Sequence, residues 1–599
     1  MQGRAAVGVR SGLGSAETGD ALPGVGIVGC GTMGSGIAEA FARAGLEVVV
    51  VVLDGAHEEV GRARIAASLE RAFADGRIDA AERDSAVAAI SFVQSVMDLA
   101  DEQLGLVVEA VPERLDAKLE VFRRLGAACP DAVLATNTSS LPVIELAAAS
   151  GVPGRVVGLH FFNPAPAMPL VELAVTMATE PGVRDEAAEF AERLGKTAVD
   201  CRDRAGFIAN VLLFPYLNEA VRLLDAGAAS RDDIDAAMRL GAGHPMGPLE
   251  LIDLIGLDAC AEILESLHRQ FAEPRYAPAP ALRERIAAGF TGRKAGHGFY
   301  GRDESPRAGA SGGDAQDFDD TLGVAGTGTV GAGLVETAAA AGLHVVCWGR
   351  SARSLERAQS VLERSTARSV EKGRLDGQRR RELLGRIRFT SEVGGLAGCG
   401  FVVEAIAEDL DAKRELFARL DAAVADDAVL ATATSSLPVV QVASATGRPE
   451  RVMGFHVFNP VPSMRLVELV RTVATSDEAA AAGERLARRL GKTVVHCRDR
   501  AGFIVNRLLF PYLNDAARMV EEGYATVADV DTVMTLGCRH PLGPLALIDL
   551  VGVDVTLEIM RSLHRELLAP AYAPVPILEQ MVAAGFLGRK SGRGFTLTG

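Results

Sequence analysis

The chain has 599 residues, of which 48% are hydrophobic and 23% are charged, and its formal net charge is −16 at pH 7. This length exceeds what one hydrophobic core supports and suggests about four domains of an ordinary globular protein. The acidic balance argues against nucleic acid or an anionic membrane surface as the main partner, although local basic pockets for a small anion stay compatible with it.

The N-terminus and the cysteines indicate where the protein works. Residues 1–21 contain Gly and Ser but no apolar signal core, so we predict a disordered tail. The longest apolar run, residues 48–53, is far shorter than the ~18 residues of a membrane span. The eight cysteines lack C-x-x-C or metal-ligand spacing, which predicts no metal site and no disulfide framework. We therefore expect a reduced, cytoplasmic protein.

The first predicted element is a short apolar strand that runs into a glycine loop, VGIVGCGTMGSGIAEAFARAG at 25–45. Gly29, Gly31 and Gly34 follow the strand and open an alanine-rich helix. This context favours a dinucleotide site, with the pyrophosphate at the helix N-terminus. Further apolar strands at 47–53, 104–111 and 132–139 alternate with helices. We predict a doubly wound parallel sheet in a Rossmann-type domain, an α/β fold over residues 22–201.

A histidine follows the next strand-like run, in GLHFFNPAPAMPLVELA at 158–174. His160 ends the run 155–160, where a doubly wound sheet places its ligand crevice. A general acid/base near neutral pH is a natural task for histidine, and Glu172 could orient its ring. The alternative is that His160 and Glu172 form a buried ion pair without catalytic function. The position of His160 beside a predicted dinucleotide-binding fold favours a catalytic role over this alternative.

The pattern changes after Gly206, where apolar residues recur at helical spacing between Gly and Pro. We predict an all-α domain at 202–300 and a flexible linker rich in Gly, Ser and Asp at 301–318.

The remainder repeats the first half with an offset of 296 residues, as His160 and His456 illustrate. A second Rossmann-type domain is predicted at 319–497 and a second helical domain at 498–599. The second glycine loop carries Gly326, Gly328 and Gly331, and Glu468 stands twelve residues after His456.

Several ordered motifs occur in this chain: the glycine loop, N-T-S-S-L, G-L-H-F-F-N-P, L-V-E, C-R-D-x-x-G-F-I-x-N and H-P-M-G-P. Together they resemble the L-3-hydroxyacyl-CoA dehydrogenases, once per half and over nearly the whole chain. The resemblance implies oxidation of the 3-hydroxyl of an acyl-CoA with NAD, with short-chain 3-hydroxybutyryl-CoA and acetoacetyl-CoA as the expected pair. In fatty acid metabolism such a step belongs to β-oxidation. The family's helical domain usually forms a dimer contact, which implies an intrachain pseudo-dimer here and allows higher homo-oligomers.

The resemblance also implies the site residues. It makes His160 and His456 the catalytic bases and Glu172 and Glu468 their partners, and it places the substrate on Ser139, Asn210, Ser435 and Asn506. It places the cofactor, besides the glycines, on Glu113, Lys118, Asn163, Lys294, Glu408, Lys413, Asn459 and Lys590. It places CoA on Ser68, Ser365 and Lys372.

Departures from the family pattern concern the end of the second strand in each half. The family's ribose-binding Asp is replaced by Val52 and by Gly349. Asp54 lies two residues further on and could substitute if the turn shifts. Arg350 and its neighbour Ser351 suit a ribose phosphate better than a bare ribose. We therefore expect NAD in the first half and allow NADP or a weakened site in the second.

Other departures lie in the crevice and in the CoA region. The second half has Ala433 where the first has Asn137, and the first half has Val211 where the second has Arg507. Asp75 occupies the first-half position that corresponds to Lys372. Two alternatives stay open: a related dehydrogenase that acts on a free hydroxy acid, such as gulonate or carnitine, and a chain in which one half is a non-catalytic scaffold.

Overall fold

The computed structural model describes residues 23–302, 304 and 320–597. The predicted tail, 1–21, and nearly all of the predicted linker, 301–318, lie outside these residues. The described chain forms two compact units. One contains residues 23–138 together with Pro142–Ala198, and the other contains Ser139–Leu141 and the described residues from Val199 onward.

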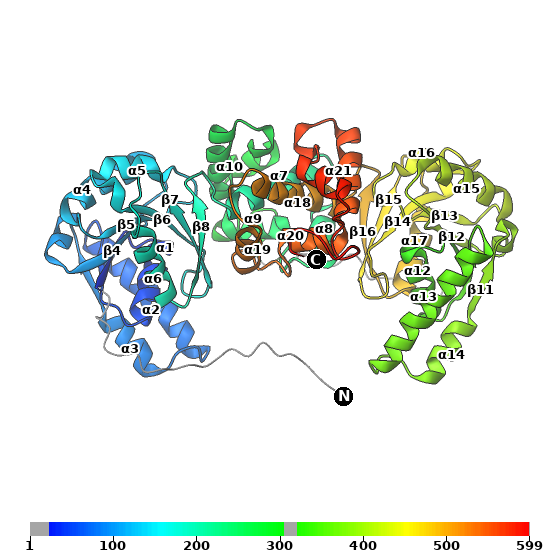
Figure 1. Ribbon diagram of the computed structural model, residues 1–599, viewed down its shortest axis with the longest axis horizontal. Coiled ribbons are helices and arrows are strands. Elements are labelled where there is room, and N and C mark those ends of the chain that lie inside the picture. The colour runs from blue at the N-terminus through cyan, green and yellow to red at the C-terminus, as the bar shows by residue number, and fades with distance from the viewer. Residues whose placement is uncertain (1–22, 303, 305–319, 598–599) are drawn as a thin grey trace. The chain divides into compact units, whose positions relative to one another are not determined.

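The first sheet has eight strands in the order β3-β2-β1-β4-β5-β6-β7-β8 (Figure 1). The pairs from β3 to β6 are parallel and β7 is antiparallel to β6. Its strands are β1 (Gly24–Val28), β2 (Val48–Val51), β3 (Ile90–Val93), β4 (Leu104–Glu109), β5 (Val133–Thr136), β6 (Val156–Phe161), β7 (Leu170–Val175) and β8 (Thr197–Arg202). The strand order reverses between β1 and β4, which places a ligand crevice at the carboxyl ends of these two strands.

Helices cover the sheet because valine-rich parallel strands are apolar on both faces. Ile37 and Phe41 pack with Ala187 and Phe190 and with Ile27 of β1 in one core cluster. The helices of this region are α1 (Thr32–Arg43), α2 (Gly55–Ala74), α3 (Ala80–Ala88), α4 (Leu115–Ala128), α5 (Val143–Ser150) and α6 (Val183–Arg193). The predicted Rossmann architecture of the first half is confirmed.

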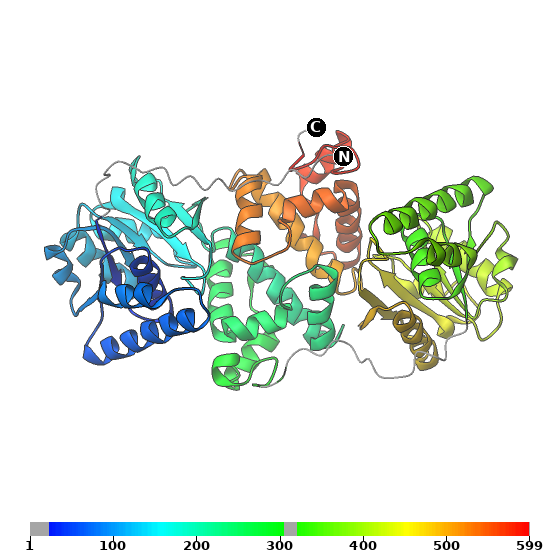
Figure 2. The same cartoon turned by 90° about the horizontal axis from the view of Figure 1, so that it is seen from below.

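The second half repeats this architecture in the order β11-β10-β9-β12-β13-β14-β15-β16. Figure 2 shows this sheet, in yellow and green, with helices on both of its faces. Its strands are β9 (Thr321–Ala325), β10 (His344–Trp348), β11 (Ile387–Thr390), β12 (Phe401–Glu404), β13 (Val429–Thr432), β14 (Val452–Val457), β15 (Leu466–Arg471) and β16 (Thr493–Arg498). Its helices are α12 (Thr329–Ala340), α13 (Ala352–Glu371), α14 (Gly377–Gly385), α15 (Leu410–Ala423), α16 (Val439–Ala443) and α17 (Asp477–Arg489). Here β15 is antiparallel to β14, as β7 is to β6.

Each sheet is followed by helices, as the loss of strand periodicity predicts. The first set is α7 (Ala209–Asp225), α8 (Arg231–Gly241), α9 (Pro248–Ile255), α10 (Leu257–Phe271) and α11 (Pro280–Ala287). The second set is α18 (Val505–Glu521), α19 (Val527–Leu536), α20 (Pro544–Val551), α21 (Val553–Leu567) and α22 (Pro576–Ala583). No helix among the described residues combines the length and the apolarity needed to cross a bilayer.

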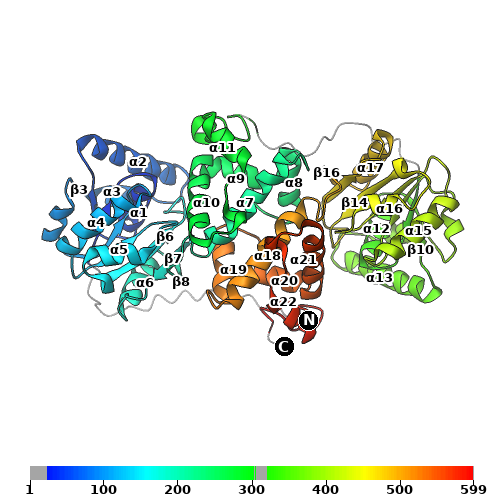
Figure 3. The same ribbon diagram turned by 90° about the horizontal axis from the view of Figure 1, so that it is seen from above.

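Helices α7 and α18 pack against each other within the second compact unit (Figure 3). The imidazoles of His244 and His540 stack between the two helical sets, with ring centroids 4.0 Å apart and an interplanar angle of 13°. Ion pairs join the two helical halves as well. Arg275 binds Asp515, and the guanidinium of Arg507 lies 2.7 Å from the carboxylate of Glu219.

Candidate active sites

The glycine loops have the geometry that a dinucleotide requires. Gly29 and Gly326 have φ of +98° and +146°, which L-residues with side chains rarely adopt. A Cβ on Gly34 would lie 1.9 Å from the Gly29 carbonyl oxygen, and one on Gly331 would lie 2.3 Å from that of Gly326. Only glycine therefore allows these helices to approach their loops.

The start of each following helix is open to a ligand. Helices α1 and α12 begin after Gly31 and Gly328, and no side chain caps either N-terminus. A Cβ on Gly31 or Gly328 would meet no atom within 4 Å. Uncapped backbone amides beside open space fit the pyrophosphate of NAD, because a helix N-terminus attracts anions.

The turn after the second strand has the same length in both halves. The first loop glycine donates its amide to Val51 O at 2.9 Å in one half and to Trp348 O at 3.0 Å in the other. The next helices begin after the caps Asp54 and Ser351. Asp54 is thus the N-cap of α2, where its carboxylate accepts hydrogen bonds from His57 N and His57 Nδ1. The turn has not shifted to place Asp54 at the position of Val52.

Each catalytic candidate pair lies on two neighbouring antiparallel strands. His160 of β6 pairs with Glu172 of β7 in the strand register, and His456 of β14 pairs with Glu468 of β15. The imidazole Nδ1 lies 2.7 Å from the carboxylate in the first half and 2.6 Å in the second. The glutamates are fully buried and the histidines nearly so. Because Nδ1 faces the carboxylate, Nε2 is the ring nitrogen available to a substrate.

The carboxylate of the second pair is itself held in place. Glu468 Oε1 accepts hydrogen bonds from Ile504 N at 3.1 Å and Val505 N at 2.9 Å, at the start of α18. Its other oxygen binds His456. The first turn of the helical domain therefore fixes the orientation of the His456 imidazole through Glu468.

The predicted substrate residues also meet. Asn506 Nδ2 donates to Ser435 O at 3.0 Å, and Asn210 Nδ2 donates to Ser139 O at 3.1 Å. Each asparagine begins the long helix of its helical domain, α18 or α7, and each serine follows a strand of the sheet. In the second half, this contact holds Asn506 beside the loop that follows β13.

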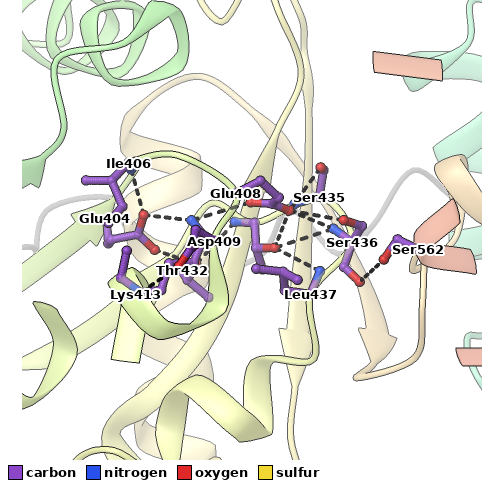
Figure 4. A network of polar contacts seen from close by, with 12 residues as sticks. Glu404, Ile406, Glu408, Asp409, Lys413, Thr432, Ser435, Ser436, Leu437 and Ser562 are labelled. Atoms are coloured by element: carbon purple, nitrogen blue, oxygen red, sulfur yellow. Dashed lines mark hydrogen bonds and ion pairs between the residues drawn. The ribbon is translucent and has the colours of Figure 1, made fainter. Parts of the chain in front are cut away.

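A network of polar contacts supports Ser435 (Figure 4). Glu408 Oε1 accepts hydrogen bonds from Thr434 Oγ1 at 2.6 Å, Ser435 N at 2.9 Å and Ser436 N at 3.1 Å. Lys413 Nζ lies 3.5 Å from the other oxygen of Glu408. Burial raises the pKa of Glu408, but the charge of Lys413 and the hydrogen bonds from Thr434 and the backbone outweigh it, so the net pKa is lowered. Glu408 is therefore an ionised anchor of the serine loop.

Two of the predicted cofactor lysines are buried in ion pairs with glutamates of the sheet. Lys118 and Lys413 are each 1% exposed and bind Glu109 and Glu404 at 2.8 and 2.7 Å. These two glutamates end β4 and β12, beside the strand of the glycine loop. Sequence reasoning missed them, although both halves carry the signal, an acidic residue within the apolar run VVEA. A buried ion pair of this kind fixes a local geometry more than it adds stability.

The other residues predicted to bind the cofactor or CoA differ in exposure and in their contacts. Asn163 and Asn459 are exposed just after β6 and β14. Lys294 and Lys590 bind Asp258 and Asp554 in the helical domains. Ser68 and Ser365 are half-buried on α2 and α13, and Lys372 is the exposed C-cap of α13.

Asn137, which Ala433 replaces in the second half, has a structural contact. Its side-chain oxygen accepts a hydrogen bond from Phe161 N at 2.8 Å. The first half therefore has a tie between β5 and β6 that the alanine cannot make. Among the described residues, no group of three His, Cys, Asp or Glu side chains could hold a metal ion.

Comparisons with known proteins agree with this geometry. The sequence pattern of the 3-hydroxyacyl-CoA dehydrogenase NAD binding domain matches residues 24–204 and 321–500, and that of the C-terminal domain matches residues 206–302 and 502–597. A 3-hydroxybutyryl-CoA dehydrogenase of Mycobacterium tuberculosis is 49% identical over 284 residues, 47% of this chain and 99% of the relative. A probable 3-hydroxybutyryl-CoA dehydrogenase of Deinococcus radiodurans is 44% identical over 274 residues, 46% of this chain and 98% of the relative.

A solved structure resembles both halves together. The crystal structure of a 3-hydroxybutyryl-CoA dehydrogenase from Escherichia coli K12 aligns with a TM-score of 0.70 and 26% identity. The alignment covers 94% of this chain and 100% of that one. The tandem arrangement therefore has a counterpart of the same fold.

Proposed function

The chain belongs to the 3-hydroxyacyl-CoA dehydrogenase family, and we propose from this premise that each half interconverts a 3-hydroxyacyl-CoA and the corresponding 3-oxoacyl-CoA. The relatives named above act on 3-hydroxybutyryl-CoA, which supports a short acyl chain. NAD supplies the acceptor or donor of hydride when it is bound. The observation that carries the proposal is the buried His–Glu pair at the end of a dinucleotide-binding sheet, present twice.

The residues have distinct roles in this proposal. Nε2 of His160 or His456 takes the proton from the 3-hydroxyl, and the carboxylate at Nδ1 stabilises the imidazolium that forms. The Ser435 hydroxyl and the Asn506 side chain bind the oxygens of the substrate in the second half, as Ser139 and Asn210 do in the first. Gly29, Gly31 and Gly34, with Gly326, Gly328 and Gly331, hold the pyrophosphate of the cofactor.

A non-catalytic second half is not favoured. His456, Glu468, Ser435 and Asn506 keep the hydrogen bonds that the chemistry needs, and Glu408 anchors the serine loop. The backbone and hydroxyl donors of Thr434, Ser435 and Ser436 that converge on ionised Glu408 support a second half with an ordered substrate loop.

Reduction of acetoacetyl-CoA with NADH, on the full chain, tests the function. Because the two halves differ at the turn after the second strand, the assay is repeated with NADPH. We expect turnover by the wild type, and by each single variant His160→Ala and His456→Ala with at least one of the two cofactors. The double variant should lose about 10²–10⁴-fold in rate, because it lacks both general acid/base groups. His344→Ala is the control, since His344 is exposed and starts β10 at the end of the strand opposite the glycine loop. Activity only with free 3-hydroxy acids, or full activity in the double variant, would contradict the proposal.

We also infer that the two helical domains pair within one chain and replace the contact between two subunits. Packing of α7 on α18, the stacked histidines and the ion pairs of Arg275 and Arg507 support this inference. A duplicated subunit carries both copies of a self-complementary surface. Tethering raises their effective concentration into the millimolar range.

A specific protease site inserted within 305–319 tests the pairing. After cleavage, the two halves should co-elute in size-exclusion chromatography at the mass of the uncut chain, 62.7 kDa or a multiple of it. Separation of the halves under native conditions would contradict an intrachain pseudo-dimer. A cytoplasmic location stays a prediction from the sequence.

A further inference from the structure

The two halves differ in charge at one position of the fold, the turn after the second strand and the first helical turns that follow. Residues 53–60 contain Asp54, Glu58 and Glu59 and neither Lys nor Arg. Residues 350–357 contain Arg350, Arg353 and Arg357 and a single acid, Glu356. Because both turns have the same length after the loop glycine, these segments occupy corresponding places.

The arginines of the second half are available to a ligand. Arg350, Arg353 and Arg357 are exposed, and no hydrogen bond or ion pair engages them within the described part of the chain. Ser351 beside Arg350 caps α13 and accepts from Ser354 N at 3.3 Å. Three guanidinium groups around a helix N-terminus form a strongly anion-attracting surface.

An acid at the position that would bind a bare ribose meets crowded surroundings in this half. A Cβ on Gly349 would lie 2.7 Å from both Leu355 Cδ2 and Thr327 Cγ2, and 2.9 Å from Ser354 Oγ. A side chain at position 349 would therefore require these neighbours to shift, and the first side chain after the strand that reaches solvent is that of Arg350. The strand before the turn ends in Trp348, which is buried and donates from Nε1 to Ser391 O at 3.1 Å.

The first half has the opposite character. The hydrogen bond from His57 N, together with that from the His57 side chain, lowers the pKa of Asp54, so its carboxylate stays ionised. The basic residues next along α2 are engaged elsewhere. Arg62 Nε donates to Glu58 at 2.8 Å, and an Arg64 nitrogen donates to Cys30 O at 3.2 Å. A phosphate placed beside this turn would face carboxylates.

We propose that the two sites of one chain use different nicotinamide nucleotides, NAD in the first half and NADP in the second, with Arg350 and Arg353 as the specificity-determining residues. In dinucleotide-binding folds, an acid after the second strand suits the ribose hydroxyls, whereas an arginine accommodates the 2′-phosphate. The planar guanidinium binds phosphate with two parallel hydrogen bonds. This inference rests on the proposed dehydrogenase function and assigns a cofactor to each of its sites.

A further activity follows if both sites accept the same acyl-CoA. At the second site the 3-oxoacyl-CoA gains hydride at C3 and a proton at its oxygen from His456, and NADPH is oxidised. At the first site the resulting 3-hydroxyacyl-CoA loses the hydroxyl proton to His160 and the hydride from C3, and NAD⁺ is reduced. The acyl-CoA is regenerated, so the chain carries hydride from NADPH to NAD⁺ with the substrate as a shuttle.

Binding of nucleotide fragments tests the assignment without turnover. Trp348 is the only tryptophan in the chain and adjoins the proposed phosphate site, so its fluorescence reports on the second half. We expect adenosine 2′,5′-bisphosphate to change this fluorescence with an affinity at least about tenfold higher than that of 5′-AMP, in line with charge-assisted phosphate contacts. Arg350→Leu combined with Arg353→Leu should remove the preference. Arg381→Leu, an exposed arginine of α14, should keep it. Equal affinities in the wild type, or an unchanged preference in the double variant, would overturn the proposal.

The shuttle is tested with NADPH, thio-NAD⁺ and a trace of acetoacetyl-CoA, by the absorbance of thio-NADH. The wild type should form thio-NADH, whereas His160→Ala alone and His456→Ala alone should not. A mixture of the two variants should restore it, because each supplies one site. Thio-NADH from a single-site variant alone would show one site using both nucleotides and would refute the division. Loss of acetoacetyl-CoA reduction with every cofactor would instead refute the dehydrogenase function.

Discussion

The carboxylate of Glu468 connects three parts of the second site. One oxygen faces His456 Nδ1 and the other accepts two backbone amides of the α18 start. A fully buried carboxylate is tolerated there because every polar contact is satisfied. The negative charge of Glu468 thereby directs the imidazole and prepares it to accept a proton.

We predict that Glu468→Gln, in a His160→Ala background, lowers kcat at the second site on the order of 10²-fold. The amide keeps the shape of the side chain but offers no charge to the imidazolium. Steady-state kinetics of acetoacetyl-CoA reduction measures the loss, and Trp348 fluorescence should show unchanged nucleotide binding. Glu450→Gln, at an exposed position of the same half, serves as the matched control. An undiminished kcat would mean that Glu468 is structural only.

At the scale of elements, we expect the contact between glycine loop and helix to decide whether a half binds its cofactor. In the second half a Cβ on Gly331 would lie 2.3 Å from the Gly326 carbonyl oxygen, a backbone atom that cannot turn away. Helix α12 would have to shift away from its loop, and the uncapped amides at its start would lose their position.

Gly331→Ala should therefore abolish nucleotide binding at the second site. It should also lower the free energy of unfolding by about 1–3 kcal/mol, which is typical of overpacking. Trp348 fluorescence measures the binding. Activity from the first site should persist in the same protein. Gly394→Ala is the matched change, because a Cβ there meets no atom within 4 Å. Normal binding by Gly331→Ala would show that the loop is not the pyrophosphate site.

A second element-level feature is the support that α8 of the first half gives to the second site. A Cβ on Gly241 would lie 2.8 Å from Val505 Cγ2 and 2.9 Å from Leu466 Cδ2. Val505 supplies one of the amides that hold Glu468. The first helical domain thus packs directly behind the catalytic pair of the second half.

Gly241→Val should push Val505 away and lower kcat at the second site several-fold in a His160→Ala background, because catalytic geometry tolerates little displacement. Gly377→Val is the control, since a Cβ there meets only the tip of Arg381, at 3.9 Å. If both variants keep the parent kcat, the packing of α8 has no influence on the site.

At the scale of the whole molecule, the stacked histidines make the contact between the helical sets sensitive to acid. Burial lowers the pKa of His244 to about 4, and burial together with His244 lowers that of His540. Tyr216 and Tyr512 hydroxyls lie 3.2 and 3.1 Å from the Nδ1 atoms of these rings. In the unfolded chain each imidazole would take up a proton near its ordinary pKa.

Stability should therefore fall as the pH drops from about 6.5 toward about 4, because only the unfolded state binds the protons in this window. At pH 5 the loss is on the order of 2 kcal/mol for His244. Thermal unfolding between about pH 7.5 and pH 5 measures it. A His244→Gln, His540→Gln double variant should show a weaker pH dependence than the wild type, and His344→Gln should not. The same slope in all three proteins would exclude the stacked pair as the source.

The sequence by itself determined the repeat, the Rossmann-plus-helical architecture and which histidines and glutamates are the candidate catalytic pairs. These features are encoded locally: glycine spacing after a strand, apolar runs of strand or helix period, and a motif that recurs at a constant offset. His160 and Glu172 could be identified as a candidate pair because a histidine and a glutamate recur at the same spacing in the second half, as His456 and Glu468.

Only the tertiary structure decided how these residues meet. A separation of twelve residues does not show that His160 and Glu172 face each other across an antiparallel pair of strands, since the return strand β7 depends on pairing and not on local propensity. The anchoring of Ser435 by Glu408, the burial of Lys413 against Glu404 and the packing of Gly241 on Val505 join segments distant in sequence. Such contacts follow from packing in three dimensions, which no local pattern specifies.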